Sequence, residues 1–284
     1  MEQQQKAEES ILVGVFGYPV HHSKSPVMHN AAFRSLGIDG YYQRFNILPE
    51  KLGDAVKAVR MLQFRGVNVT IPHKVAIIKY LDDITREAEL IGAVNTIVHE
   101  DGRLIGTNTD GIGYVQSLRE EIDIDLNRAH VLVLGAGGAA RAIATQLALS
   151  GVHAICITNR TFEKAEELAR VIGKIQPNTY ALPMSELFAR MKDFTIVINT
   201  TSVGMSPNSD ESPLPADYLP EHLIVSDLVY NPRQTRLLQL AEKRGCQVHG
   251  GIGMLVYQGA EAFRLWTGME PPIAVMWDAL LQSL

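Results

Sequence analysis

The sequence predicts an α/β fold with two domains, each made of a sheet covered by helices. Three observations support this prediction. The chain has 284 residues, which is enough for two domains. Short apolar runs alternate with segments of helical spacing along most of the chain, as parallel sheets require. A glycine-rich turn, residues 135–140, joins an apolar run to a helical one.

The first domain is expected over residues 11–111, after a polar tail at residues 1–10. Its sheet should be mixed and mainly parallel, because the dipeptide Asp101-Gly102 predicts a tight hairpin turn among strands that otherwise alternate with helices. The expected strands are Ile11–Phe16, Tyr41–Phe45, Gly66–Thr70 and the hairpin runs 92–98 and 103–106, and the expected helices are 26–36, 49–62 and 84–91.

The second domain is expected over residues 112–253. Residues 254–284 should return and complete the first domain, because its first strands have few other partners for their apolar faces. The expected strands are 131–134, 153–158, 179–182, 194–198, 223–228 and 247–248, and the expected helices are 112–122, 139–149, 162–172, 185–191, 235–244 and 250–266, with a short C-terminal helix after Pro272.

The glycine-rich turn predicts a nucleotide site and a Rossmann-type second domain. Gly135 turns the backbone, Gly137 lets a ligand approach closely, and Ala140 keeps the next helix tight against the sheet. That helix directs unpaired N–H groups and the positive end of its dipole beyond the strand, where a pyrophosphate fits. Glycine turns also serve simply to reverse a chain, so the motif is weak by itself.

Residues 159–161 indicate which nucleotide binds. About 20 residues after the last glycine, an NAD-binding fold usually carries an acid for the ribose hydroxyl, but this chain has Asn159, Arg160 and Thr161. An arginine can clamp a 2′-phosphate, and the two neutral side chains can add hydrogen bonds. The pattern favours NADP over NAD. An exposed loop arginine is the plainer interpretation of Arg160 taken alone.

Composition and charge argue against several classes of function. Lys and Arg total 26 against 31 Asp and Glu, a net charge of −5, which argues against general nucleic-acid binding. Cys156 and Cys246 lie in apolar strand-like runs, so we expect a reduced cytosolic protein without a metal site. The apolar run Ile11–Phe16 is too short for a secretory signal. Charged and polar residues interrupt residues 131–157, so no membrane span is expected.

Polar side chains follow the strands of the first domain, where open sheets place their ligands. Ser23 and Ser25 precede a helix and offer two hydroxyls to an anion such as a carboxylate. Lys74 follows the strand 66–70, and Asp110 precedes another helix. Each residue also has a plainer interpretation: Ser25 and Asp110 as helix caps, Ser23 as a loop residue and Lys74 as a solvated cation.

Several motifs occur together in one order: residues 16–26, 68–74, 92–96, 108–111, 135–140, 159–161 and 251–258. Together they resemble shikimate dehydrogenase over nearly the whole chain after the tail. Gly250 departs from the family pattern, in which an acid often stands at this position. The family reduces 3-dehydroshikimate to shikimate with NADPH, in the pathway to aromatic amino acids, and the resemblance implies an active-site cleft between the substrate domain and the Rossmann-type NADP-binding domain.

The resemblance also implies roles for individual residues. It makes Lys74 and Asp110 catalytic, moving a proton as hydride is transferred. It assigns substrate binding to Ser23, Ser25, Thr70, Lys74, Asn95, Asp110, Tyr230 and Gln258. It assigns cofactor binding to Gly135, Ala136, Gly137, Gly138, Ala139, Asn159, Arg160, Thr161, Lys164, Leu228, Gly251 and Met254. Without the resemblance, Asn95 would be a turn residue, Gln258 a helix-surface residue and Tyr230 part of the core.

The implied partners are NADP(H) and the small molecules shikimate and 3-dehydroshikimate, with no metal, nucleic acid or membrane. The expected location is the cytoplasm, and a homodimer is one candidate assembly. Three alternatives stay open: a quinate/shikimate dehydrogenase of broader substrate or cofactor range, a non-catalytic shikimate-binding regulator on the same fold, and a methylene-folate dehydrogenase. An acid in place of Arg160 would favour NAD, and loss of Lys74 or Asp110 would favour the regulator.

Overall fold

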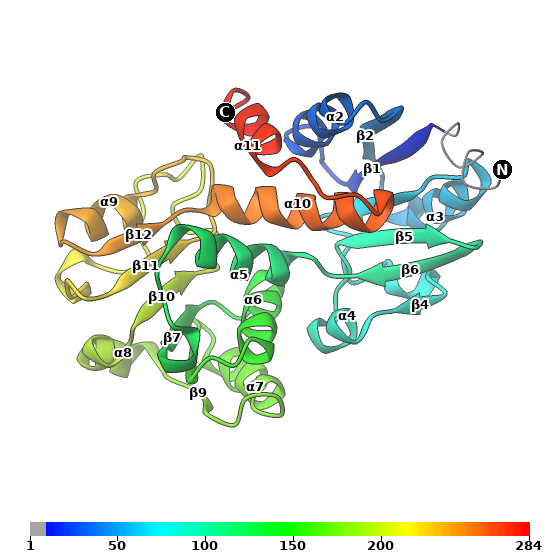
Figure 1. The fold of residues 1–284 in the computed structure, drawn as a ribbon. Helices are drawn as coiled ribbons and strands as arrows, with labels where there is room; N and C mark the ends of the chain where they lie inside the picture. Colours follow the sequence, from blue (N-terminus) through cyan, green and yellow to red (C-terminus); the bar gives the residue numbers. More distant parts are fainter. Residues whose placement is uncertain (1–9) are drawn as a thin grey trace. The chain divides into compact units, whose positions relative to one another are not determined.

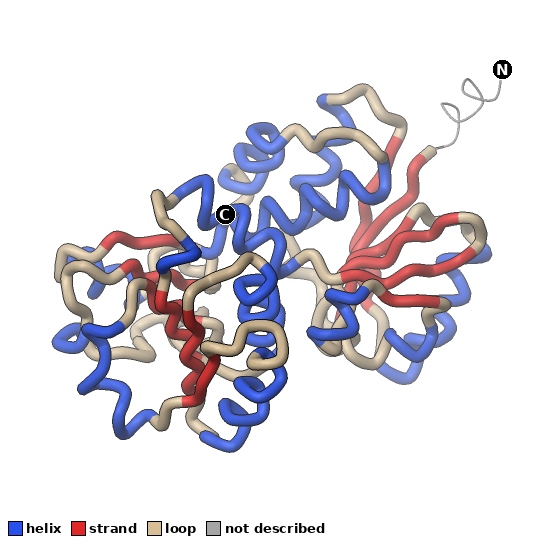
Figure 2. Tube along the Cα trace, turned by 60° about the horizontal axis from the view of Figure 1, so that its bottom comes forward, coloured by secondary structure: helices blue, strands red, loops and turns tan. Residues whose placement is uncertain are grey.

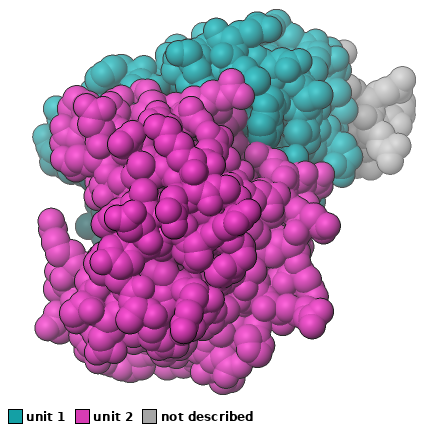
Figure 3. Space-filling model, turned by 90° about the vertical axis from the view of Figure 1, so that its left-hand side faces the viewer, with its two compact units in different colours: residues 1–109, 256–284 teal, residues 110–255 magenta. Residues whose placement is uncertain are grey.

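A computed structural model describes residues 10–284 of the chain. It contains two compact units: the first unit holds residues up to 109 together with 256–284, and the second unit holds residues 110–255 (Figure 3). In each unit the strands gather into a sheet with helices beside it (Figure 2). The predicted polar tail lies outside the described residues except for Ser10.

The first unit is built on a six-stranded sheet in the order β2-β1-β3-β5-β6-β4. Strands β2, β1 and β3 are parallel, β5 is antiparallel to both β3 and β6, and β4 is parallel to β6. The predicted mixed, mainly parallel sheet is therefore confirmed. The strands are β1 (Ile11–Gly17), β2 (Gly40–Asn46), β3 (Gly66–Val69), β4 (Asp83–Ile84), β5 (Thr96–Glu100) and β6 (Arg103–Thr107), and the helices are α2 (Ser25–Ser35), α3 (Leu52–Met61) and α4 (Arg86–Ile91).

Local sequence explains several of these bounds. Asp101 and Gly102 both have positive φ, +49° and +76°, which is the geometry of the predicted tight turn between β5 and β6. The helix expected from Ile84 begins later, because Ile84 pairs with β6 and Thr85 caps α4 through its side chain. The single helix expected over residues 49–62 is a 3-10 turn followed by α3.

The C-terminal residues pack on the N-terminal elements of the first unit. Helix α11 (Ile273–Leu281) lies beside α2 (Figure 1). The indole N–H of Trp266 donates to the carbonyl of Ile97 in β5 at 2.9 Å. Phe263 packs against Phe33 of α2, with ring centroids 5.1 Å apart. These buried aromatic rings join the two ends of the chain in one core.

The second unit has an all-parallel sheet in the order β12-β11-β10-β7-β8-β9. This is the Rossmann strand order, and it confirms the predicted fold type. The strands are β7 (His130–Leu134), β8 (Ala154–Thr158), β9 (Thr179–Ala181), β10 (Ile196–Asn199), β11 (Ile224–Asp227) and β12 (Gln247–His249), and the helices are α5 (Asp110–Glu121), α6 (Gly138–Leu149), α7 (Phe162–Ile172), α8 (Met184–Arg190), α9 (Arg236–Lys243) and the start of α10 (Gly251–Thr267).

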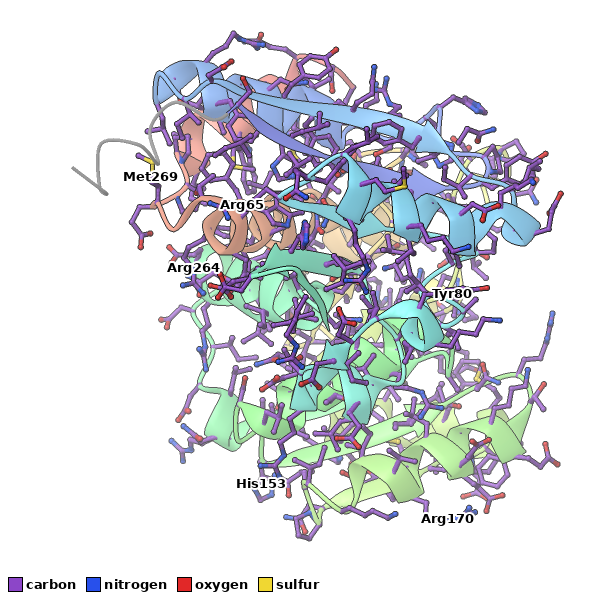
Figure 4. The ribbon with its side chains drawn as sticks, turned by 90° about the vertical axis from the view of Figure 1, so that its right-hand side faces the viewer. Arg65, Tyr80, His153, Arg170, Arg264 and Met269 are labelled. Carbon is purple, nitrogen blue, oxygen red and sulfur yellow. The ribbon has the colours of Figure 1, made fainter. Side chains whose placement is uncertain are left out.

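Strand β7 divides its side chains between two cores, one on each face of this sheet. Val131 and Val133 pack in the core that α5, α6 and α7 cover, whereas Leu132 and Leu134 pack in the core on the other face. A strand that is buried on both faces has a continuous run of apolar residues, and this run is the reason that the sequence predicts β7. Helix α7 turns its apolar side inward and leaves Arg170 exposed (Figure 4).

No helix within residues 10–284 is both long enough and apolar enough to cross a membrane. In the same part of the chain, no three His, Cys, Asp or Glu side chains gather in an arrangement that could hold a metal ion.

Candidate functional site

The glycine turn follows β7 at the carboxyl end of the parallel sheet. Gly135 has φ +115°, and a Cβ there would lie 2.6 Å from Oγ1 of Thr200, so only glycine fits this position. Thr200 donates its hydroxyl to the carbonyl of Leu134 at 2.6 Å, which holds the turn against β10. At Gly137 and Gly138, in contrast, a Cβ would meet no described atom within 4 Å. Side chains at these two glycines would fill the space in front of α6.

Helix α6 begins directly after this turn, at Gly138. Its cap residue, Gly137, is extended and has no side chain to bond the first N–H groups of the helix. The N–H of Arg141 makes the first bond of the helix, to the carbonyl of Gly137 at 3.0 Å. The amides before Arg141 and the helix dipole together form a site for an anion.

The loop after β8 lies next to this turn, because β7 and β8 are paired and the N–H of Gly135 donates to the carbonyl of Thr158 at 2.8 Å. The side-chain amide of Asn159 donates to the carbonyl of Thr161 at 2.9 Å, which shapes the loop. Arg160 and Lys164 are both exposed. The second unit therefore brings the predicted phosphate-binding residues to the ends of neighbouring strands.

Three residues predicted for the nicotinamide end also lie in the second unit. A Cβ on Gly251 would be 2.3 Å from the carbonyl oxygen of Leu228, so the first residue of α10 passes directly against the end of β11. Leu228 and Met254 are partly buried and pack against the same core as α5 and α6. The structure thus brings Leu228, Gly251 and Met254 into one region.

Ser23 and Ser25 lie together at the start of α2 in the first unit. Their hydroxyls are 3.3 Å apart, and the backbone N–H of Ser25 points to the hydroxyl of Ser23 at 3.4 Å. The expectation that Ser25 caps the helix was wrong, because α2 begins at Ser25 itself and Lys24 occupies the cap position without a side-chain bond. Arg44 donates to the carbonyl of Ser23 at 2.8 Å and fixes the loop.

Lys74 follows β3 on a short connection that is held at both ends. The N–H of Thr70 donates to the carbonyl of Phe16 at 2.9 Å, and the N–H of Val94 donates to the carbonyl of Lys74 at 2.8 Å. Between them, His73 is buried and its Nε2 lies 2.7 Å from the carbonyl oxygen of Ile47. The backbone at Lys74 is therefore fixed, and the side chain is partly buried.

Asn95 is a buried hub of hydrogen bonds rather than an exposed turn residue. Its Oδ1 accepts from the N–H of Thr109 at 2.8 Å and from the hydroxyl of Thr96 at 3.0 Å. Its amide group donates to the hydroxyl of Thr109 at 3.0 Å. The N–H of Val94 donates to the carbonyl of Lys74, and Thr109 precedes Asp110, so these hydrogen bonds fix the backbone next to both residues.

Asp110 is the first residue of α5 and is partly buried, so it is not a cap outside the helix. A carboxylate in the first turn interacts favourably with the helix dipole.

Tyr230 is partly buried, and burial raises the pKa of its hydroxyl. Gln258 is buried in α10 instead of lying on the helix surface. Asp110 and Tyr230 belong to the second unit, whereas Gln258, Ser23, Ser25, Thr70, Lys74 and Asn95 belong to the first.

Sequence reasoning missed the polar side chains behind these residues. The hydroxyl of Tyr42 donates to Asn68 at 2.7 Å, and the amide of Asn68 donates to the hydroxyl of Thr96 at 2.9 Å. Burial raises the pKa of Tyr42, against the opposing effects of a hydrogen bond with Ser25 and of the Arg44 charge. A buried polar chain thus runs from Ser25 to Asn95. Its only signal in the sequence was polar residues inside apolar strands.

Three segments of the chain match models of shikimate dehydrogenase domains. The substrate binding domain of shikimate dehydrogenase matches residues 15–97, shikimate / quinate 5-dehydrogenase matches residues 117–207, and the shikimate 5'-dehydrogenase C-terminal domain matches residues 251–281.

Relatives and solved structures extend the likeness over nearly the whole chain. The chain is 48% identical over 280 residues to the NADP(+) shikimate dehydrogenase of Methanopyrus kandleri, which covers 97% of both proteins. It is similar to the shikimate 5-dehydrogenase of Thermus thermophilus in complex with NADP(H) and shikimate, with 41% identity, a TM-score of 0.88 and coverage of 96% and 100%. The quinate dehydrogenase of Corynebacterium glutamicum in complex with NAD is 30% identical, with a TM-score of 0.90 and coverage of 96% and 99%.

Proposed function

The chain belongs to the shikimate dehydrogenase family, and from that premise we propose that it reduces 3-dehydroshikimate to shikimate with NADPH, reversibly. The observation that carries the proposal is the glycine turn with Arg160 in place of an acid at the next strand end. The turn suits the phosphates common to both dinucleotides, and the arginine suits the phosphate that only NADP has.

The second unit supplies residues that fit the dinucleotide. Gly137 and Gly138 leave room for the pyrophosphate before α6, and the amides of Gly138 and Ala139 would donate to it. Arg160 and Lys164 would bind the 2′-phosphate, with Asn159 and Thr161 shaping their loop. Leu228, Gly251 and Met254 would line the nicotinamide end, with Gly135, Ala136 and the remaining turn residues forming the cradle.

The first unit supplies residues that fit the substrate. The paired hydroxyls of Ser23 and Ser25 suit its carboxylate, because both can donate hydrogen bonds to one anion. Thr70, Asn95 and Gln258 would bind the ring hydroxyls, with Tyr230 from the second unit. A rigid network behind Ser25 and Asn95 supports this assignment, because substrate groups are held best by side chains that are themselves fixed.

Lys74 and Asp110 are the residues to which we assign the chemistry. When bound, NADPH supplies the hydride. As negative charge grows on the carbonyl oxygen of the substrate, the ammonium of Lys74 stabilises it and donates the proton. We assign Asp110 to the same proton-transfer step, as the second catalytic residue. In the oxidising direction, the lysine accepts the proton from the shikimate hydroxyl. The fixed backbone at Lys74 and the Asn95–Thr109 bonds support this assignment.

Initial rates with four pairs of substrate and cofactor test the proposal. Shikimate and quinate are each assayed with NADP and with NAD, by following formation of the reduced nicotinamide. We expect the highest kcat/KM with shikimate and NADP. Equal or higher kcat/KM with quinate and NAD would replace the proposal with the alternative of a quinate dehydrogenase, which the likeness to the Corynebacterium glutamicum protein keeps in view. No turnover with any pair would favour a shikimate-binding regulator.

The setting of this activity is also part of the proposal. We propose a cytoplasmic location, which is consistent with both cysteines being free thiols. A homodimer is the proposed assembly. Sedimentation velocity of the full chain tests this assignment, with a dimer mass expected and a monomer mass contradicting it.

A further inference from the structure

Helix α5 carries a row of polar side chains below Asp110. Tyr114, Ser117 and Glu121 follow Asp110 at helical spacings of four, three and four residues, so all four share one face of the helix. Tyr114 and Ser117 are fully buried against the sheet of the second unit. The helix that begins with the proposed catalytic aspartate is therefore docked through hydroxyl groups as well as apolar packing.

His249, the last residue of β12, contacts this row through one ring nitrogen and β11 through the other. Its Nε2 lies 2.8 Å from Oγ of Ser117, and its Nδ1 lies 2.9 Å from Oγ of Ser226 in β11. The side chain of His249 is 1% exposed. The ring thus joins α5, β11 and β12 at one buried point.

The hydrogen bonds around His249 run in one direction. The hydroxyl of Tyr114 donates to Ser226 at 3.0 Å, which leaves the hydrogen of Ser226 for Nδ1 of His249. Ser117 donates to Oε1 of Glu121 at 2.6 Å, so it is free to accept from Nε2–H. These partners assign the ring proton to Nε2. In this chain every hydroxyl donates once, and the chain ends on a carboxylate.

Glu121 provides a charged end to this chain. Burial raises the pKa of its carboxyl, but the hydrogen bond from Ser117 and the nearby His249 ring, 3.6 Å away, outweigh burial, so the net effect is a lowered pKa. The carboxylate is therefore ionised at neutral pH. A charged acceptor makes the bond from Ser117 stronger than one between neutral groups.

The start of α10 lies directly on the same cluster. A Cβ on Gly253 would be 2.0 Å from Oε1 of Glu121 and 2.1 Å from Oγ of Ser117. Gly253 stands between Gly251 and Met254, which we assign to the nicotinamide end. His249 is also only two residues before Gly251, where α10 begins. The same histidine therefore contacts α5 through Ser117 and lies next to the first turn of α10 in the sequence.

We infer that His249 is a positioning residue for the proposed reaction. Its contact with Ser117 fixes the helix that begins with Asp110. Ser117 and Glu121 also pack against Gly253 and so fix the first turn of α10, which carries Met254. The inference rests on the proposed function and adds to it a residue that touches neither substrate nor cofactor. Small displacements of reacting groups cost large factors in rate, so the effect of losing His249 falls on kcat.

The test compares two leucine substitutions in the second unit. His249→Leu removes both ring bonds at the cluster. His130→Leu is the matched control, because His130 also has both ring nitrogens bonded, to Asp193 at 2.9 Å and Tyr180 at 3.0 Å, but lies at the opposite, amino end of the sheet. Each variant is assayed with shikimate and NADP, and its folded fraction is measured by circular dichroism. His249→Gln, whose side chain carries an NH₂ donor group and an oxygen acceptor, is the rescue variant.

We expect His249→Leu to lower kcat by about tenfold or more while the KM for shikimate changes less than threefold. His249→Gln recovers most of kcat, and His130→Leu keeps kcat within twofold of the wild type. If His249→Leu does not fold, Ser117→Ala takes its place, because it removes only a single hydroxyl. Its kcat and its KM for shikimate are then measured in the same way.

An unchanged kcat in folded His249→Leu, or in Ser117→Ala in its place, overturns the inference, and so does an equal loss in His130→Leu. An inactive wild type would instead contradict the proposed function.

Discussion

The side-chain oxygen of Asn95 accepts a hydrogen bond from the backbone N–H of Thr109 at 2.8 Å. Both residues are buried, and Thr109 is the last residue before Asp110. This bond fixes the backbone that leads into α5, so Asn95 has a structural role in addition to the substrate contact that we propose for it. Three further bonds link its side chain to the hydroxyls of Thr96 and Thr109.

Asn95→Ala should therefore cost stability as well as activity. It leaves the buried N–H of Thr109 without its acceptor, which costs about 1–3 kcal/mol in the free energy of unfolding. Thr109→Val is the control, because it removes the hydroxyl but keeps the backbone bond, and we expect a smaller loss. Urea unfolding of both variants checks this order. A larger loss in Thr109→Val would show that the backbone bond is not the important one.

Arg160→Ala should weaken binding of NADP much more than binding of shikimate. Loss of a charge-assisted bond to phosphate corresponds to about 10- to 100-fold in the KM for NADP, while the KM for shikimate stays nearly unchanged. The control is Arg170→Ala, another exposed arginine of the second unit, on the outer face of α7 (Figure 4). Equal increases in the two KM values, or an effect of the same size in Arg170→Ala, would count against the phosphate clamp.

His29 should make the protein less stable in mild acid. The ring is fully buried, is stacked on Tyr42 with centroids 4.3 Å apart, and neither nitrogen hydrogen bonds a described atom. Burial lowers the pKa of His29 from 6.5 to about 3. The unfolded chain therefore binds a proton that the folded chain does not. Stability is lost as the pH falls through the unfolded pKa of 6.5, and it is fully present well above that pH.

The size of this effect follows from the pKa values. Between pH 7.5 and pH 5.5, His29 lowers the free energy of unfolding by about 1.4 kcal/mol. In His29→Phe, which keeps a stacked ring without a titrating group, this part of the pH dependence should disappear. Urea unfolding of the two proteins at both pH values measures it. The same pH dependence in wild type and variant would show that another group is responsible.

Two adjacent glycines offer a matched pair of substitutions at the nicotinamide end. Gly251→Ala places a Cβ 2.3 Å from the carbonyl oxygen of Leu228, so the backbone must shift, at a cost of about 1–3 kcal/mol. At Gly250 the nearest atom to a new Cβ is 3.9 Å away, on Leu238, and alanine fits. We expect a lower Tm and a higher KM for NADP in the first variant only. Similar values in both would contradict the close approach of α10 to β11.

Local patterns predicted most of the fold, because the features concerned depend on neighbouring residues. The strand and turn at 131–135, the hairpin at Asp101-Gly102 and the helix 162–172 all follow from periodicity and glycine positions. The caps were harder to predict. Ser25 and Asp110 are both acceptable cap residues, yet each is the first residue of its helix, because the choice among adjacent positions depends on tertiary packing.

The buried polar chains could not be predicted in this way. Tyr42, Asn68 and Thr96 are bonded across 26 and 28 residues of sequence, and Ser117 and His249 across 132. No local pattern marks such partners. The roles of Lys74, Asp110 and the other site residues came from the family resemblance, and for this chain they stay predictions that the variants above and below address.

Turnover of Lys74→Ala is the most direct test of proton transfer by Lys74. The substitution removes the group that we assign to proton transfer, and it lies outside the unit that carries the glycine turn. We predict that kcat for shikimate oxidation falls by about 10²- to 10⁴-fold, while the dissociation constant for NADP, measured by fluorescence titration, stays within about twofold. Lys79→Ala, an exposed lysine on the following 3-10 turn, should keep wild-type kcat. A Lys74→Ala protein with wild-type kcat would contradict the assignment of Lys74 to the reaction.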